Sequence, residues 1–120
     1  MVTNFEDLTE DLTPDEIALL KPLIKGLETK TKDNPIKAPE IIKAMNTFAK
    51  SKGLATISEP RLRKLINHIR VNGILPVIAT SKGYYISYDK QEVLDQITSL
   101  TQRANSILNS TDGLRKFLLT

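Results

Sequence analysis

Apolar residues recur at the spacing of an amphipathic α-helix in three stretches that precede residue 73. The first stretch predicts a helix over residues 14–29. Its apolar face is formed by Ile17, Leu20, Ile24 and Leu27, widened by Leu19 and Leu23. Thr13 and Glu16 are spaced as in a capping box around Pro14, which suits the first helical position. Pro22 has no backbone donor for the helix, so we expect a kink there.

The second and third stretches predict two further helices. One is expected to begin at Pro39 and end at Gly53, and the other to begin after Ser58, which can cap it, and end at Asn72-Gly73. The second helix presents Ile41, Ile42, Met45, Phe48 and Ala49 on one face, and the third has Leu62, Leu65, Ile66 and Ile69 at i, i+3, i+4 and i+7. That spacing indicates a single buried stripe along each helix. Between the first two helices, Ile36–Ala38 is predicted to be a very short extended segment.

The periodicity then changes to that of β-structure. Residues 76–80 and 84–87 are short runs rich in β-branched and aromatic residues, and Ser81-Lys82-Gly83 between them is a tight-turn sequence. We therefore predict a β-hairpin. Tyr84 and Tyr85 must point to opposite faces of their strand, and we favour Tyr85 as the buried one.

The last segment is predicted to be a helix that Asp89 caps, with Glu92 at a capping-box position. Eight positions alternate at four-residue and three-residue spacing along it, and seven of them are apolar. We call these positions the α-helical seam: Val93, Ile97, Leu100, Ala104, Ile107, Thr111, Leu114 and Leu118. Such a seam is typical of a dimeric coiled coil, or of a helix that packs on the core of its own chain. We expect Ser110–Gly113 to break the helix near its end.

The order of these elements is that of a winged helix-turn-helix domain. Two helices support a third, and the hairpin projects its turn as a wing. We predict a mostly α fold with a small β-hairpin, in which an acidic N-terminal segment (1–12) precedes the winged helix-turn-helix domain (13–88) and a long C-terminal helix (89–120).

The charge of the chain is unevenly distributed. The net charge of +3 combines −6 over residues 1–20, +9 over residues 21–88 and zero over residues 89–120. A basic segment of this density can neutralise phosphates, which supply most of the non-specific affinity for nucleic acids. The acidic N-terminal segment either keeps the chain soluble, binds a basic partner or shields the basic face in cis.

The third helix carries most of the candidate binding side chains, and they lie on its outer face. If its apolar stripe faces inward, its polar residues point outward or to the flanks: Arg61, Arg63, Lys64, Asn67, His68 and Arg70. Arginine and lysine can donate to guanine edges or phosphates, and asparagine can pair with adenine. We therefore predict DNA contacts at Arg61, Arg63, Lys64, Asn67 and His68, or a merely solvated helix face. Arg70 and Asn72 are alternatively placed to hold the hairpin.

The hairpin turn adds a second predicted contact. Ser81 and Lys82 lie at its tip, where Lys82 can reach a phosphate or a minor groove. The alternative reading is that Gly83 serves only the positive φ of the turn.

The sequence from Ile57 to Gly73, followed by Pro76 to Tyr85, resembles small winged-helix proteins of phages and prophages. In that family an Arg-rich third helix ends in Arg-x-Asn-Gly, as at residues 70–73 here, and leads to a Ser-Lys-Gly-Tyr-Tyr wing. The winged N-terminal domain of the biotin operon repressor is similar more loosely. The resemblance implies DNA binding through Arg61, Arg63, Lys64 and Asn67, with a wing contact at Lys82. Pro60 departs from the small residue usual in the family.

Other classes of function find little support in the sequence. The chain has no cysteine and one histidine, and its five glycines do not form a phosphate loop. We expect no enzymatic activity, cofactor, metal, small-molecule ligand or membrane span. We expect a cytoplasmic transcriptional or replication accessory factor of a bacterial or phage-infected cell, with double-stranded DNA as partner. The alternative is a winged-helix protein-protein interaction module that does not bind DNA.

Overall fold

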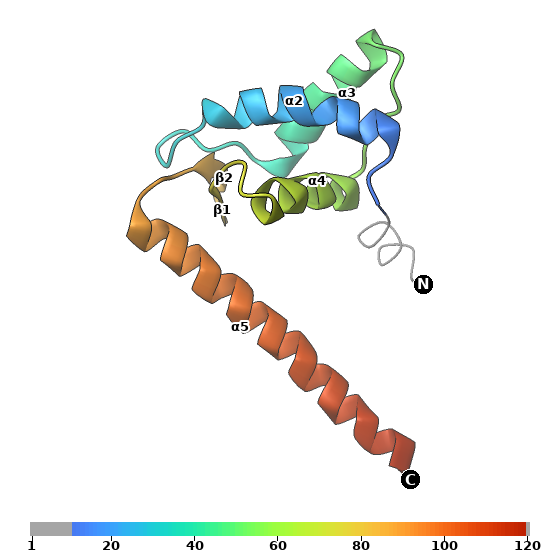
Figure 1. The fold of residues 1–120 in the computed structure, drawn as a ribbon, viewed down its shortest axis with the longest axis vertical. Helices are drawn as coiled ribbons and strands as arrows, with labels where there is room; N and C mark the ends of the chain where they lie inside the picture. Colours follow the sequence, from blue (N-terminus) through green and yellow to red (C-terminus); the bar gives the residue numbers. More distant parts are fainter. Residues whose placement is uncertain (1–10, 120) are drawn as a thin grey trace. The chain divides into compact units, whose positions relative to one another are not determined.

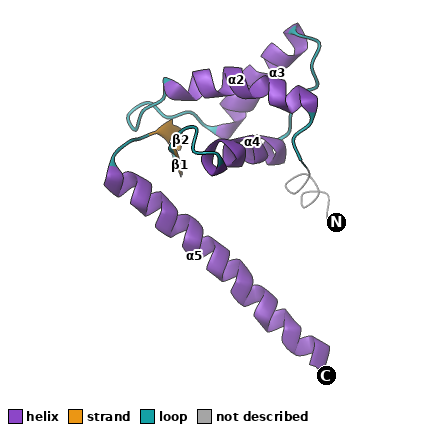
Figure 2. Ribbon diagram, in the orientation of Figure 1, coloured by secondary structure: helices purple, strands orange, loops and turns teal. Residues whose placement is uncertain are grey.

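The computed structural model describes residues 11–119 of the chain, which are mostly helical with one small β-hairpin (Figure 1). The chain divides into two units, one ending at Ser87 and the other beginning at Tyr88. Among the described residues, the first unit contains three helices and the hairpin, and the second contains a single long helix with a short 3-10 turn (Figure 2). The role predicted for residues 1–10 of the acidic segment lies outside the described residues.

Helix α2 (Pro14–Glu28) has the start that the sequence predicts. The side chain of Thr13 accepts a hydrogen bond from the backbone of Glu16 at 3.1 Å, and the Glu16 carboxylate accepts one from the Thr13 backbone at 2.8 Å. This reciprocal pair is the predicted capping box. The helix remains continuous through Pro22.

Helices α3 (Ala38–Ser51) and α4 (Glu59–Val71) follow the predicted boundaries closely. The loop that joins them is fixed by Asn46, whose side-chain amide donates to the Ile57 carbonyl and accepts from the Ile57 amide. The prediction that the Ser58 side chain caps α4 is wrong, since Ser58 makes no side-chain cap bond. A capping side chain bonds the second or third helical amide. Pro60 at the second position has no amide hydrogen, which leaves only the Arg61 amide, and Ser58 does not bond it.

The core of the first unit lies between the three helices and the hairpin. All four predicted stripe residues of α4 are buried, and three of them are among the most completely buried side chains of the unit. These fully buried residues are Leu19, Leu27, Leu62, Leu65 and Ile69. The helical periodicity of the sequence therefore identified the buried face of α4 correctly.

Strands β1 (Val77–Thr80) and β2 (Gly83–Ile86) form the predicted antiparallel hairpin. Ile36 adds a single bridge beside it: its amide donates to the Tyr84 carbonyl at 2.9 Å and its carbonyl accepts from the Tyr84 amide at 2.7 Å. Tyr85 is buried, as favoured from the sequence, and Tyr84 is half-buried against the core. Arg70 on α4 donates to the Val77 carbonyl at 3.1 Å, so this arginine does hold the hairpin.

A glycine is required at position 83 for a second reason besides the turn. Its φ is +129°, and a Cβ at this position would lie 2.5 Å from the Ile36 carbonyl oxygen. The reading that Gly83 serves only the turn is therefore incomplete, because the close approach of the Ile36 backbone also excludes a side chain.

The second unit consists of α5 (Lys90–Arg115) and the 3-10 turn η1 (Lys116–Leu119). The Asp89 side chain caps α5 by accepting from the amides of Gln91 and Glu92. The predicted break at Ser110–Gly113 is wrong, because the helix continues to Arg115. The hydroxyls of Ser110 and Thr111 bond to carbonyls of the preceding turn without ending the helix. No residue of α5 is buried.

Candidate nucleic-acid interface

The outer face of α4 is formed by the residues opposite its buried stripe. Arg63, Asn67 and Val71 are exposed, while Lys64 and His68 are half-buried on the same side. This arrangement follows from the helical period, which turns these positions away from the core once Leu62, Leu65, Ile66 and Ile69 face inward. The structure thus brings four of the five predicted α4 contacts together on one accessible surface, which we call the α4 face: Arg63, Lys64, Asn67 and His68.

Arg61 does not belong to the α4 face. Its guanidinium forms a bidentate pair with the Glu16 carboxylate, in which Nε and Nη2 each lie 2.6 Å from one carboxylate oxygen. Nη2 also donates to the Asp11 carbonyl at 3.0 Å. Only 12% of the Arg61 side chain and 9% of the Glu16 side chain are exposed. The prediction that Arg61 is exposed is therefore wrong, because this side chain joins α4 to α2.

The electrostatics of this pair are consistent with a structural role. Hydrogen bonds from Arg61 hold the pKa of Glu16 below its ordinary value of 4.5, against the burial that raises it. Glu16 is thus a capping residue and an ion-pair partner at once. The sequence revealed the capping box but gave no sign of the arginine, which lies 45 residues further along the chain.

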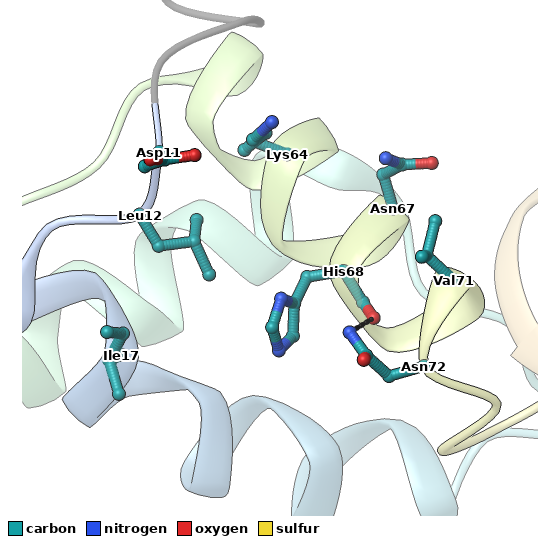
Figure 3. A pocket seen from close by; sticks show the side chains of 8 residues that line it. All are labelled: Asp11, Leu12, Ile17, Lys64, Asn67, His68, Val71 and Asn72. Carbon is teal, nitrogen blue, oxygen red and sulfur yellow. Dashed lines mark hydrogen bonds between the residues drawn. The ribbon is translucent and has the colours of Figure 1, made fainter.

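A hollow of about 370 Å³ lies beside the α4 face (Figure 3). Leu12 and His68 point into the same space, with Ile17 on α2 opposite. The complete lining is Asp11, Leu12, Ile17, Lys64, Asn67, His68, Val71 and Asn72. Asn72, which the sequence offered as a support for the hairpin, instead donates to the His68 carbonyl within its own helix at 2.9 Å.

Arg63 has a partner on its own helix. Its Nη2 lies 2.8 Å from a Glu59 carboxylate oxygen, and both side chains are at least half exposed. Exposed pairs of this kind contribute little to stability, so Arg63 can exchange Glu59 for another anion at small cost. Arg63 therefore stays available to a phosphate or a base edge, unlike Arg61.

The tip of the hairpin carries the remaining predicted contacts. Ser81 and Lys82 are exposed, and the Lys82 amide donates to the Thr80 hydroxyl at 3.2 Å. A second hollow of about 290 Å³ beside the turn is lined by these residues together with Lys32, Asp33, Thr80 and Tyr85. Lys32 and Asp33 were not predicted as site residues. The Ile36 bridge ties the loop after α2 to the hairpin, and it joins segments too far apart in sequence for a local pattern to reveal.

Comparisons with known proteins add no relative. No family model, curated protein or solved structure matches the chain. Within residues 11–119, no three or more histidine or acidic side chains gather as a metal site, and no helix has the length and apolar character needed to cross a membrane. The α4 face and the hairpin tip are therefore the surfaces that point to a function.

Proposed function

We propose that the first unit is a winged helix-turn-helix domain that binds double-stranded DNA through the α4 face and the hairpin tip. The element order supports the fold: three helices, an extended Ile36 beside the hairpin, and a two-stranded wing. The observation that carries the function is the α4 face, where Arg63, Lys64 and Asn67 are accessible and no acidic residue follows Glu59 in the helix.

Each side chain of this surface has a chemistry suited to DNA. Asn67 is exposed in the middle of α4 and can both donate to and accept from an adenine edge. Lys64 and Arg63, near the start of the helix, can donate to guanine or to phosphate. Lys82, at the exposed tip of the hairpin, suits a phosphate or the minor groove.

The biological role that fits this surface is that of a phage-type transcriptional or replication accessory factor. It rests on the resemblance of residues 57–85 to phage winged-helix proteins. We propose no catalytic role and no small-molecule effector.

The test is a salt titration of binding to a random-sequence duplex. Lys64→Ala is expected to weaken binding and to reduce the slope of log K against log[salt] by about 1, as for loss of one phosphate contact. Asn67→Ala is expected to weaken binding to a selected site while leaving the salt slope unchanged, because an amide does not displace a counterion.

Lys43→Ala is the matched control for Lys64→Ala. Lys43 is exposed on α3 and its loss changes the net charge equally. If both lysine variants weaken binding equally, the α4 face is not the site. Absence of duplex binding by the wild-type chain at low salt would refute the proposal and favour a protein-protein interaction module.

A further inference from the structure

Helix α5 has an apolar face that the structure leaves uncovered. Ile97, Ile107 and Leu114 are 53%, 60% and 67% exposed, and no residue of the helix is buried. Helices draw most of their stability from packing an apolar face against another element. The amphipathic pattern of α5 therefore indicates that its apolar face packs against another surface.

The exposed face follows the seam predicted from the sequence. The structure shows that α5 is unbroken from Lys90 to Arg115, so the seam positions from Val93 to Leu114 lie on one helix. These positions span about 31 Å at 1.5 Å per residue. Their alternating spacing averages 3.5 residues, which is the repeat of two helices that supercoil around each other.

The residues that flank the seam favour a second copy of this chain as the occupant. Charges at the flanking positions of a coiled coil set the choice of partner, and here most are uncharged. The polar flanking residues are Gln96, Thr101, Arg103, Ser110 and Arg115. The only charges among them are two arginines, and pairing with a copy sets neither arginine against another cation.

Pairing with a copy also brings no like charges together. In a parallel, in-register pair, Arg103 lies opposite Leu108 of the second copy, and Ser110 lies opposite Arg115 of the second copy. The acidic residues of α5 lie away from the seam and do not repel across it: Glu92, Asp95 and Asp112. Leu94 and Leu108, exposed by 53% and 58%, widen the apolar face beside the seam.

We propose that α5 is a self-association surface, which pairs along its seam with α5 of a second copy of this chain. A dimer would carry two α4 faces, one from each copy. Any use of both faces on DNA rests on the proposed DNA binding, whereas the pairing of the helices does not.

The test is the mass of the full chain in solution, measured by light scattering over a range of concentrations. We expect twice the chain mass of 13.4 kDa for the wild type and a single chain mass for Ile107→Asp, which places a carboxylate in the seam. Asn109→Asp is the matched control, because Asn109 is exposed on the opposite side of α5 and receives the same carboxylate. It is expected to remain a dimer.

Two outcomes would overturn the pairing: a monomeric wild type at every concentration, or equal dissociation of both variants. Circular dichroism supplies an independent readout. If pairing stabilises α5, helicity rises with concentration in the wild type and not in Ile107→Asp; a concentration-independent signal with a monomeric mass refutes the idea.

Duplex binding separates this proposal from the proposed function. A dimer that binds no duplex leaves the pairing intact and refutes DNA binding. If both hold, Ile107→Asp keeps its affinity for a short duplex with one site and loses the tighter binding to a duplex with two sites. Equal affinity of dimer and variant for the two-site duplex would refute the joint engagement of two α4 faces.

Discussion

Arg61 offers the sharpest test, because sequence and structure assign it different roles. The sequence predicts a DNA contact, whereas the structure places its guanidinium against Glu16 with two contacts of 2.6 Å. Arg61→Ala removes both bonds and leaves a carboxylate in a site where 9% of its side chain is exposed. Breaking a buried pair in this way costs about 3–5 kcal/mol. Since some of each side chain still reaches solvent, we expect a loss of about 3 kcal/mol in the free energy of unfolding.

Urea denaturation measures this loss, and Arg63→Ala is the matched control on the same helix. The Arg63–Glu59 pair is about half exposed, so its removal is expected to cost less than about 0.5 kcal/mol. The double variant Glu16→Gln/Arg61→Ala is expected to recover part of the stability, because no uncompensated charge remains. Equal losses for Arg61→Ala and Arg63→Ala would refute the structural role of Arg61.

Duplex binding completes the comparison. At a temperature where Arg61→Ala is folded, its affinity is expected to stay near that of the wild type, whereas Lys64→Ala binds more weakly. A folded Arg61→Ala that loses affinity as strongly as Lys64→Ala would return Arg61 to the DNA-binding surface.

Three further predictions concern the stability of the first unit. The pKa of Glu16 is lowered in the fold, so its ionised form stabilises the fold above the ordinary value of 4.5, and this stability is lost as the pH falls through the folded pKa. Glu16→Gln should therefore flatten this part of an acid-unfolding curve. An unchanged curve would contradict the assignment. Gly83→Ala should lower the free energy of unfolding in urea by about 2 kcal/mol or more, because a Cβ would lie 2.5 Å from the Ile36 carbonyl oxygen. Gly26→Ala, with open space around it, should lower it by nothing. Similar values for both variants would refute the close approach. Leu65→Ala should destabilise by about 3–5 kcal/mol in the same assay and Val71→Ala, on the same helix, by under about 1 kcal/mol, since Leu65 is fully buried and Val71 is 74% exposed.

Local patterns in the sequence predicted the helices and the hairpin, because their causes lie within a few residues. The buried stripe of α4 follows from the spacing of Leu62, Leu65, Ile66 and Ile69. The capping box of α2 follows from Thr13 and Glu16 alone. Errors arose even here when two local effects competed. Pro60 removes one of the two amides that a Ser58 side-chain cap could use, and α5 stays helical through residues 110–113, whose turn-forming types predicted a break.

Contacts between distant segments could not be predicted in this way. Helical phase places Arg61 on the flank of α4, where it can turn toward solvent or toward a neighbouring helix. The ion pair with Glu16 turns Arg61 toward the neighbouring helix, and no local pattern reveals this pair because the two residues lie 45 positions apart in sequence. The same is true of Gly83, whose need for a bare Cα comes from Ile36 across the fold.

These contacts also reduce the positive charge that the basic segment of residues 21–88 can offer to DNA. Of the four cationic side chains of α4, Arg61 is neutralised by Glu16, Arg63 is paired with Glu59, and Arg70 donates to a carbonyl of the hairpin. Lys64 is the remaining one, and it lies on the α4 face. The excess of +9 over residues 21–88 therefore overstates the charge that the α4 face and the hairpin tip together offer to DNA. A wild-type salt slope that counts Lys64, Lys82 and an exchangeable Arg63 is about −3, whereas a slope that counted every base of the segment would be several-fold steeper.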